Sequence, residues 1–343
     1  MFSSQRRFQL LAASLLLLSC SKNHSLTVKI ITPPGSDDPF LLASQVRMTL
    51  GDQQTTAAVA GGHFSTTLTI ESPTDGQQTQ LLVEALDGSG MVVGRGRSPT
   101  FGIQLADSEV AVYVGKPGLV TSSDLKLPDD SMQNAQGRKG LAGCALRGRR
   151  TSPPEPGLGA LLVGGESEGA LLSTKAWVFK HSTFQILDGG TISKGRRGAV
   201  LVPSADATIG QQGLLVGGTG TGTDMITQTE LFDPSVTTLS AVWSAPAVEI
   251  GDIGKPGMYR PAAAELGDSV FLVAGGAIDP NTEQPSGQAV LVKRFPAQSA
   301  DMLARVGVAT VPPPVDRTTA LVVPRYRHSM TVLSSGTLLF GGL

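Results

Sequence analysis

Charged and aromatic side chains are scarce in this chain of 343 residues. Charged residues make up 16% of the sequence and aromatic residues 5%, and the 27 basic residues nearly cancel the 28 acidic ones. A protein that binds nucleic acid or an anionic membrane surface through its own charge carries a clear excess of Lys and Arg. We therefore expect neither partner, while the 40% hydrophobic content indicates a folded protein rather than a disordered one.

Cysteine and histidine are also rare, which excludes two further kinds of site. The sequence has two cysteines, Cys20 and Cys144, too few for a disulfide framework. Cys144 lies in the apolar run LAGCALRG, where we expect a small buried core residue rather than a reactive thiol. The histidines lack the spacing of metal ligands, so the sequence predicts no metal and no cofactor. The histidines are His24, His63, His181 and His328.

A hydrophobic run is present at residues 8–18, behind Arg6 and Arg7. A run of this length is too short to span a bilayer and is typical of a secretory signal peptide, which we place at residues 1–19. The run ends in the quartet LLSC at residues 17–20, which resembles the bacterial lipobox. In lipoproteins with that motif the cysteine is acylated and becomes the new N-terminus. The alternative is an ordinary signal peptide followed by an incidental cysteine.

The lipobox resemblance implies that Cys20 is the lipidation site and that residues 20–25 form a tether. Each buried acyl methylene contributes about 0.8 kcal/mol, so two or more acyl chains anchor a protein stably in a membrane. Ser21 and Lys22 follow the cysteine, with no acidic residue at the second mature position. By resemblance to the sorting of known lipoproteins, this favours the outer membrane. We expect a lipid-anchored protein of the cell envelope, on its periplasmic or its surface face.

Short runs with alternating hydrophobic and polar residues predict β-strands within residues 26–115. Turn-forming clusters separate these runs about every ten residues, which is typical of a β-sandwich. The segment 63–94 resembles the fibronectin or immunoglobulin-like modules of bacterial envelope proteins, which usually serve as spacers or adhesins. At residues 116–139 the composition changes to Pro, Ser, Asp and Asn, which predicts a linker. The predicted strands are 26–30, 46–50, 56–60, 64–70, 80–86, 91–94 and 110–114.

A hydrophobic triplet followed by two glycines recurs four times within residues 140–343. The first glycines of these doublets are 53, 58 and 66 residues apart, close to the period of about 50 residues that is typical of kelch repeats. Kelch repeats build β-propellers, in which each repeat is a four-stranded sheet that is stabilised by its neighbours. The doublets are Gly164 and Gly165, Gly217 and Gly218, Gly275 and Gly276, and Gly341 and Gly342.

Further features of residues 140–343 resemble bacterial kelch-repeat lipoproteins with galactose-oxidase-like repeats. Phe179 and Phe232 each lie 15 residues past the first glycine of their doublet, and Trp243 closes the second repeat. The first repeat lacks the closing tryptophan, and the third lacks the aromatic residue of strand three. Copper radical oxidases share the repeat form, but this chain lacks their local motifs for the cross-linked cysteine and the metal ligands, so we do not expect that activity.

The start of the fourth repeat, RYRHS at residues 325–329, matches the kelch pattern for the start of strand one. Arg197 and Arg260 are weaker counterparts of it in earlier repeats. We expect each doublet to lie where the chain turns beside a closely approaching backbone, because a Cβ atom would obstruct that position. The doublet glycines are therefore predicted to be structural.

The repeats amount to three four-stranded sheets and the first half of a fourth, whereas propellers normally have four to eight complete ones. We therefore expect a partial propeller of three to four blades, incomplete at its C-terminal end. One explanation is that further repeats are missing from a truncated reading frame. The other is that residues 110–114 and 118–122 supply the outer strands of the fourth blade.

The sequence favours a lipid-anchored, non-catalytic protein whose propeller binds a protein or a glycan of the envelope. The alternative is a carbohydrate-active enzyme of the sugar isomerase type, by analogy with periplasmic kelch-like proteins. A cluster of arginines and carboxylates at the mouth of the central channel would favour the enzyme, and an apolar or aromatic patch on the loops would favour the binding protein. We assign no catalytic pair among the loop carboxylates Asp224, Asp279, Glu283 and Asp316.

Overall fold

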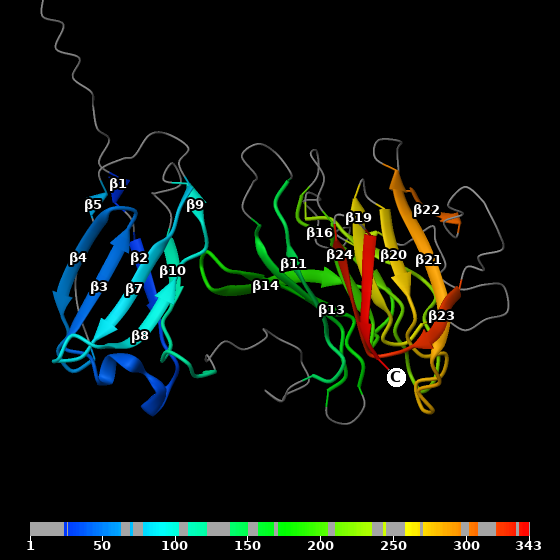
Figure 1. Cartoon of the computed structure of the whole chain (residues 1–343), viewed down its shortest axis with the longest axis horizontal. Helices are drawn as coiled ribbons and strands as arrows, with labels where there is room; N and C mark the ends of the chain where they lie inside the picture. The colour runs from blue at the N-terminus through cyan, green and yellow to red at the C-terminus, as the bar shows by residue number, and fades with distance from the viewer. Residues whose placement is uncertain are drawn as a thin grey trace, which may run out of the picture.

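The computed structural model shows an all-β protein, as the sequence predicts. Its strands form two groups, β1–β10 and β11–β25, which lie side by side (Figure 1). The helical elements of the described residues are two 3-10 turns, η1 (Gly35–Asp37) and η2 (Pro39–Leu41), and this part of the chain contains no helix long and apolar enough to cross a membrane. The described residues are 24–25, 27–62, 69–70, 78–102, 109–121, 138–149, 157–167, 171–204, 210–234, 243–244, 258–267, 270–295, 302–307, 320–333 and 336–342.

The N-terminal group contains an antiparallel four-stranded sheet in the order β4-β3-β7-β8 and a parallel pair formed by β2 and β10. Two short antiparallel pairs, β1 with β5 and β6 with β9, flank them. The strands are β1 (His24–Ser25), β2 (Thr27–Ile31), β3 (Gln45–Leu50), β4 (Gln53–Ala58), β5 (Thr69–Ile70), β6 (Gln78–Thr79), β7 (Leu81–Leu86), β8 (Val92–Arg97), β9 (Phe101–Gly102) and β10 (Glu109–Tyr113).

The strands predicted near residues 26–30, 46–50, 56–60, 80–86, 91–94 and 110–114 are confirmed. Most of the predicted strand at 64–70 lies outside the described residues. Alternate residues of β3 and β7 point to one face of the four-stranded sheet and pack against β2 and β10. This core contains Val46, Met48, Leu50, Leu81, Val83, Ala85, Val110 and Val112.

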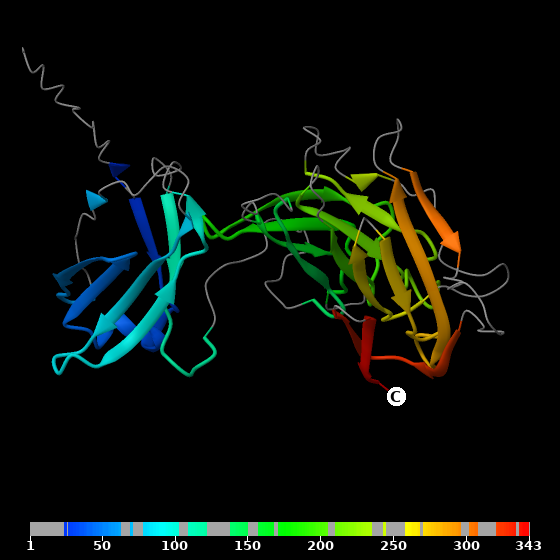
Figure 2. The ribbon, with the colours of Figure 1, turned by 45° about the horizontal axis from the view of Figure 1, so that its top comes forward.

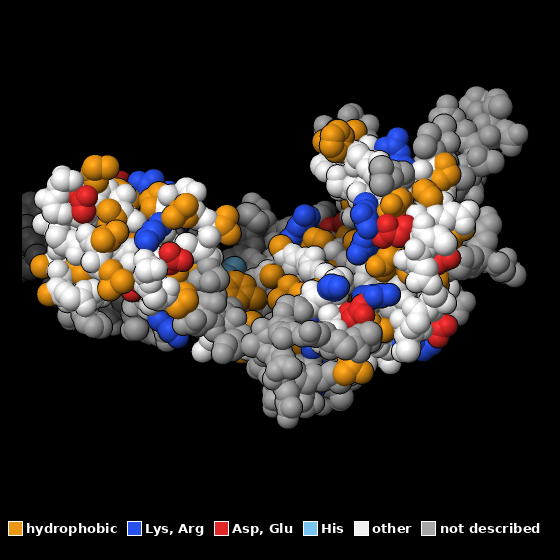
Figure 3. Space-filling model, turned by 90° about the horizontal axis from the view of Figure 1, so that it is seen from below, with side chains coloured by type: hydrophobic (Ala, Val, Ile, Leu, Met, Phe, Trp, Pro, Cys, Tyr) orange, Lys and Arg blue, Asp and Glu red, His pale blue; other side chains and the backbone are white. Residues whose placement is uncertain are grey.

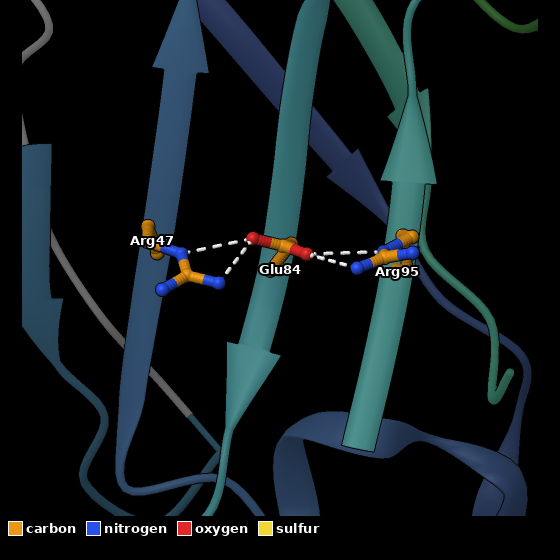
Figure 4. A network of polar contacts seen from close by, with 3 residues as sticks. All are labelled: Arg47, Glu84 and Arg95. Carbon is orange, nitrogen blue, oxygen red and sulfur yellow. Dashed lines mark hydrogen bonds and ion pairs between the residues drawn. The ribbon is translucent and has the colours of Figure 1, made fainter. Parts of the chain in front are cut away.

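The opposite face of this sheet carries a buried carboxylate between two arginines (Figure 4). Glu84 of β7 accepts hydrogen bonds from Nε and Nη2 of Arg47 on β3, at 2.8 and 2.6 Å. Its other oxygen accepts from Nε and Nη2 of Arg95 on β8, at 3.0 and 2.6 Å. Burial acts to raise the pKa of Glu84, but the two arginines outweigh it and the pKa is lowered. The ionised carboxylate therefore ties three neighbouring strands together.

The C-terminal group consists of successive antiparallel sheets, each running through its strands in chain order. The first is β11-β12-β13-β14, the second β15-β16-β17-β18, and the third β19-β20-β21-β22 with β23 also paired to β21; β24 and β25 form a two-stranded sheet. The strands are β11 (Ala142–Leu146), β12 (Gly159–Val163), β13 (Lys175–Lys180), β14 (Gln185–Thr191), β15 (Val200–Ser204), β16 (Gln212–Val216), β17 (Glu230–Phe232), β18 (Trp243–Ser244), β19 (Ala262–Gly267), β20 (Val270–Ala274), β21 (Ser286–Phe295), β22 (Met302–Gly307), β23 (Ala320–Arg325), β24 (His328–Leu333) and β25 (Gly336–Gly341).

The first strands of the successive sheets, β11, β15, β19 and β24, lie next to one another in that order. Hydrophobic side chains fill the space between the sheets, and Leu161 and Leu215 belong to the same buried cluster. Trp243 also joins two sheets, because its Nε1 donates a hydrogen bond to the carbonyl of Gly189 at 2.8 Å while its ring packs against Phe232. No sheet of this group is packed on its own.

The proposal that residues 110–114 complete the fourth sheet of the C-terminal group is wrong. β10 pairs in parallel with β2 over its whole length, so it belongs to the N-terminal group. Instead, the hairpin of β13 and β14 reaches toward β10 (Figure 2). The amide of Ala111 donates to the carbonyl of Ser182 at 2.7 Å, and the rings of Tyr113 and Phe184 stack with their centres 5.6 Å apart.

All eight doublet glycines have positive φ angles, between 67° and 92°. The second glycine of a doublet donates its N–H to the carbonyl of a residue just before the next sheet: Gly165 to Arg196 and Gly218 to Met258, both at 2.8 Å. A Cβ atom on the first glycine would lie against the same carbonyl, 2.4 Å from the oxygen of Met258 in the case of Gly217. Each of the first three doublets therefore joins its own sheet closely to the next one.

Two substitutions that differ only in their surroundings test this interpretation. We expect Gly341→Ala to lower the free energy of unfolding by about 1 kcal/mol, which is the cost of a left-handed backbone for a residue other than glycine. No further loss is expected, because a Cβ there has no neighbour within 4 Å. Gly217→Ala should cost at least about 1 kcal/mol more, since its Cβ collides with the backbone of the next sheet. Denaturant unfolding of both variants measures the difference. Equal losses of stability in Gly341→Ala and Gly217→Ala would show that the close approach of the next sheet is not the reason for glycine at position 217.

We expect Glu84→Gln to lower the free energy of unfolding by about 1–3 kcal/mol, because it leaves two guanidinium groups without their charge partner. The carboxyl pKa is lowered in the folded state, so this contribution is present above the ordinary glutamate pKa of about 4.3 and is lost as the pH falls through lower values. Arg97→Gln, two residues after Arg95 and exposed, is the control. Urea unfolding at neutral and acidic pH measures both, and a loss that is the same at both pH values would contradict the expectation.

Candidate functional site

Three residues precede the first strand of each C-terminal sheet and occupy equivalent places in every repeat. We call them the lead-in segments; they are residues 138–140, 196–198, 258–260 and 325–327. The carbonyl of the first residue accepts the hydrogen bond from the preceding doublet, as in Arg196, Met258 and Arg325. The second residue pairs with the residue that follows its own doublet, as Arg197 does with Thr219. The lead-in segments therefore lie along one line across the sheets.

The third residue of each lead-in segment has a left-handed backbone. Its φ is 64° in Gly140 and Gly198, 52° in Arg260 and 55° in Arg327. The segments are also bonded to one another, since Gly198 donates to the carbonyl of Gly140 at 3.0 Å. Arg260 donates in the same way to the carbonyl of Gly198 at 2.7 Å. Glycine adopts this conformation without strain, whereas an arginine in it costs about 1 kcal/mol or more.

Arg260 and Arg327 converge on one carboxylate. Oε1 of Glu283 accepts from Nη2 of Arg327 at 2.7 Å and from Nη1 of Arg260 at 3.4 Å. Glu283 itself has a φ of 51°, so all three members of the cluster have a left-handed backbone. The hydrogen bond from Arg327 lowers the pKa of Glu283, and Glu283 in turn raises the pKa of Arg327.

Tyrosine rings lie beside both arginines. The guanidinium of Arg260 lies 5.0 Å from the centre of the Tyr259 ring, and that of Arg327 lies 5.4 Å from the centre of the Tyr326 ring. The two rings share a buried cluster with Ala277, which fixes the backbone from which the arginines extend. The arginine side chains remain partly accessible, with exposed fractions of 38% for Arg260 and 51% for Arg327.

A second ion pair lies along the same line of lead-in segments. Nη1 of Arg197 contacts Oε2 of Glu166, which follows the first doublet. The ring of Tyr259 lies directly over Gly198, where a Cβ atom would come within 2.1 Å of it, so this pair adjoins the Glu283 cluster. In Figure 3, Lys and Arg side chains lie with a few Asp and Glu side chains among them on the underside of this group of sheets.

The repeat pattern of the sequence aligns Arg197 and Arg260 with the start of the fourth repeat, and the structure confirms this for one of them. Arg260 is the counterpart of Arg327, but Arg197 falls one position earlier, in register with Tyr259. The repeated dipeptide Tyr-Arg, at residues 259–260 and 326–327, is the signal that could have identified the cluster. No local pattern identifies Glu283 as their partner, because the two arginines lie 23 and 44 residues away from it in the sequence.

Of the other loop carboxylates considered in the sequence, the described Asp279 does not join this cluster. Cys20 and Asp316 lie outside the described residues, and the carboxylate of Asp279 caps its own turn, accepting from the amide of Asn281 at 2.8 Å. Among the described residues, no group of three or more His, Cys, Asp or Glu side chains could hold a metal ion. Cys144 is partly buried against the hydrophobic cluster between the first two sheets rather than fully buried in it, and burial raises the pKa of its thiol to about 12.

A cavity of about 200 Å³ lies where the β13–β14 hairpin meets the N-terminal group. Most of its wall is apolar, and burial lowers the pKa of His181 beside it. No Lys, Arg, Asp or Glu among the described residues lines this cavity, so its described wall offers little to orient a polar ligand. Its wall includes Pro99, Phe101, Val110, Leu158, His181 and Gln211.

Comparison of the sequence with known proteins does not assign it to a family. No protein-family model matches the chain, and no curated protein matches it either.

Proposed function

We propose that the protein is a lipoprotein of the cell envelope, anchored in the outer membrane, whose C-terminal sheets bind a protein or a glycan. In this proposal Cys20 carries the acyl chains, the N-terminal group is an immunoglobulin-like or fibronectin-like β-sandwich that acts as a spacer, and the C-terminal group is a partial kelch-type propeller. The packing of the β4-β3-β7-β8 sheet on β2 and β10 supports the sandwich. The repeated meanders with adjoining first strands support the propeller.

The observation that carries the binding role is the strained cluster of Arg260, Arg327 and Glu283. Left-handed non-glycine residues are uncommon and concentrate at functional sites. The first two sheets have glycine at the third lead-in position, so the fold does not require a side chain there. The arginines are therefore retained in spite of backbone strain, and a ligand-binding role accounts for this.

The charges of the lead-in segments indicate which ligands would bind. Their second and third residues include four cations, Lys139, Arg197, Arg260 and Arg327. Two carboxylates, Glu166 and Glu283, pair with three of these. The local excess is positive, and exposed guanidinium groups bind carboxylate, sulfate or phosphate oxygens in pairs. We propose a ligand with anionic groups, either an acidic glycan or an acidic surface of a protein.

A sugar isomerase is the second candidate, because arginines and a carboxylate at such a position are groups that this chemistry would use. The environment of Glu283 weighs against it. A general acid needs a carboxyl pKa near the working pH, whereas the hydrogen bond from Arg327 lowers the pKa of Glu283. An ionised carboxylate that is already paired with two arginines is better suited to holding them in place.

The anchor is tested by Cys20→Ala in the full chain, followed by membrane fractionation and labelling with a fatty acid. We expect the wild-type protein in the membrane fraction with label, and the variant without label and released from the membrane. Ser21→Ala, beside the cysteine, is the matched control and should behave like the wild-type protein. A variant that stays in the membrane, together with an unlabelled wild-type protein, would refute the anchor.

The binding face is tested with soluble protein from residue 21 to 343 on immobilised alginate, a polysaccharide of uronic acids, and on neutral dextran. A second arm uses immobilised envelope proteins. We expect retention on alginate or on acidic envelope proteins that weakens with salt, and at least about ten-fold weaker binding for Arg260→Gln with Arg327→Gln. Arg97→Gln in the N-terminal group is the charge-matched control. The proposal would be refuted if the variant with Arg260→Gln and Arg327→Gln were retained as strongly as Arg97→Gln. It would also be refuted if dextran retained the wild-type protein as strongly as alginate does.

The enzyme alternative has a separate readout. In a binding protein neither the wild-type protein nor Glu283→Gln turns over a sugar, whereas an isomerase would lose turnover of its sugar in Glu283→Gln. Proton exchange of candidate sugars, followed by NMR with wild-type protein, distinguishes the two. Turnover by the wild-type protein that is lost in Glu283→Gln would favour the enzyme.

A further inference from the structure

The cavity beside the β13–β14 hairpin, which we call the junction cavity, has walls from both groups of strands. Phe101 of β9 and Val110 of β10 contribute from the N-terminal group, and Leu158, His181 and Gln211 contribute from the C-terminal group. Figure 3 shows hydrophobic side chains and a histidine at this junction. None of the described lead-in residues lines the cavity, so its occupant would contact both groups without touching the arginine cluster.

Backbone hydrogen bonds join the segments that form the wall. The amide of Ala111 donates to the carbonyl of Ser182 at 2.7 Å, which fixes β10 to the hairpin turn. The amide of His181 donates to the carbonyl of Leu158 at 3.3 Å, which fixes the same turn to the segment before β12. The backbone around the cavity is therefore held in place before any ligand arrives, as in most small-molecule sites.

Strained backbone also lies at this junction. Five residues other than glycine have a positive φ in the described part of the chain, and three of them form the Glu283 cluster. The other two are Gln211, with a φ of 63°, and Phe184, with a φ of 51°. Gln211 belongs to the wall, and Phe184 lies in the hairpin turn that carries His181. Such strain concentrates at ligand sites, so the junction is a second candidate for one.

The volume of the cavity indicates the size of its occupant. An apolar cavity of about 150 Å³ stays dry and binds benzene. The junction cavity, at about 200 Å³, has room for one six-membered ring with a small substituent. Its wall contains the rings of Phe101 and His181, and aromatic rings favour edge-to-face or offset contacts with one another. A rigid ring also loses less conformational freedom on binding than an aliphatic chain does.

The wall determines the charge of the occupant as well. Its described residues include no Lys, Arg, Asp or Glu. Burial lowers the pKa of His181, so the imidazole is neutral at neutral pH. A charged ligand would lose its hydration here without gaining a counter-ion, which is costly. The wall therefore favours a neutral molecule.

Gln211 supplies a polar group that the fold does not use. Its backbone amide donates to the carbonyl of Arg147, but its carboxamide forms no hydrogen bond with another described residue. A carboxamide can both donate and accept, so it suits a hydroxyl group, which does the same. One such polar contact in an apolar pocket orients a ligand.

We propose that the junction cavity binds a small neutral aromatic molecule with one hydroxyl group, of the size of phenol. The ring packs against Phe101 and Leu158, and the hydroxyl bonds the carboxamide of Gln211. This site is independent of the anionic ligand proposed above. Because its walls come from both groups of strands, the bound molecule stabilises the contact between Ala111 and Ser182.

The test uses protein from residue 21 to 343, which contains every described residue, and phenol as the probe. Saturation-transfer NMR should show binding with a dissociation constant of about 1 mM or lower. Cyclohexanol has the same hydroxyl without the aromatic ring, while benzoate and benzylamine carry a charge, and each should bind at least about ten-fold more weakly. Absence of phenol binding up to about 10 mM would overturn the proposal. Equal binding of cyclohexanol, benzoate or benzylamine would overturn the assigned ligand class.

Three variants locate the bound probe. Leu158→Phe fills part of the cavity and should weaken phenol binding at least about ten-fold. Leu187→Phe makes the same change at a position of β14 that is 41% exposed, and this control should bind like the wild-type protein. Gln211→Met should weaken the binding of phenol but not that of benzene. Phenol binding that is unchanged in both Leu158→Phe and Gln211→Met would place the probe elsewhere and refute the site.

Hydrogen exchange gives a readout in the wild-type protein, in case Leu158→Phe fails to fold. Saturating phenol should slow exchange of the Ala111 amide, because the ligand stabilises the junction that protects it. The same concentration of cyclohexanol should leave that exchange unchanged. The variant with Arg260→Gln and Arg327→Gln should bind phenol like the wild-type protein, which separates this site from the anionic-ligand site. Exchange at Ala111 that is equally fast with and without phenol would contradict the proposal.

Discussion

The C-terminal half of the structure depends on the close approach between each of the first three glycine doublets and the lead-in segment of the next sheet. The approach combines a hydrogen bond of 2.8 Å from the second glycine, as from Gly218 to Met258, with a first glycine whose Cβ would lie 2.4 Å from that same carbonyl oxygen. Backbone approaches backbone here, so the spacing of the sheets does not depend on side chains. The clusters between the sheets can then vary in composition while the sheets keep their order.

Because the backbone sets the spacing, the side chains of the lead-in segments are free to take different roles. Arg196 and Arg197 are neighbours in sequence, yet the first is buried against Glu230 and the second is 30% exposed beside Glu166. Burial lowers the pKa of Arg196, and Glu230 opposes that effect. Taking this pair out of water is costly, whereas the pair of Arg197 and Glu166 is partly exposed and stays in contact with water. Adjacent arginines therefore serve packing in one case and remain available to a ligand in the other.

The sequence predicted the all-β class, most strands and the positions of the doublets, because period-two patterns and paired glycines are local signals. It did not predict that β10 pairs in parallel with β2, since strand pairing depends on contacts distant in sequence. The Glu283 cluster was missed for the same reason: its arginines come from two lead-in segments and its carboxylate from a loop of the third sheet. Cys20 stays a prediction, because it lies outside the described residues.

Comparison between the repeats explains why an arginine in this chain cannot be assigned a role from its charge alone. At the first lead-in position the side chain contacts the third strand, and its partner there differs from sheet to sheet. Arg138 lies over an aromatic ring, Arg196 is neutralised by a carboxylate, and Met258 packs in a hydrophobic cluster. At the third position the backbone is left-handed and the side chain extends beside a tyrosine toward solvent. Arg325 and Arg327, two residues apart, thus have different surroundings: Arg325 donates to the carbonyl of Gly341 in the fourth sheet, and Arg327 belongs to the face of the lead-in segments.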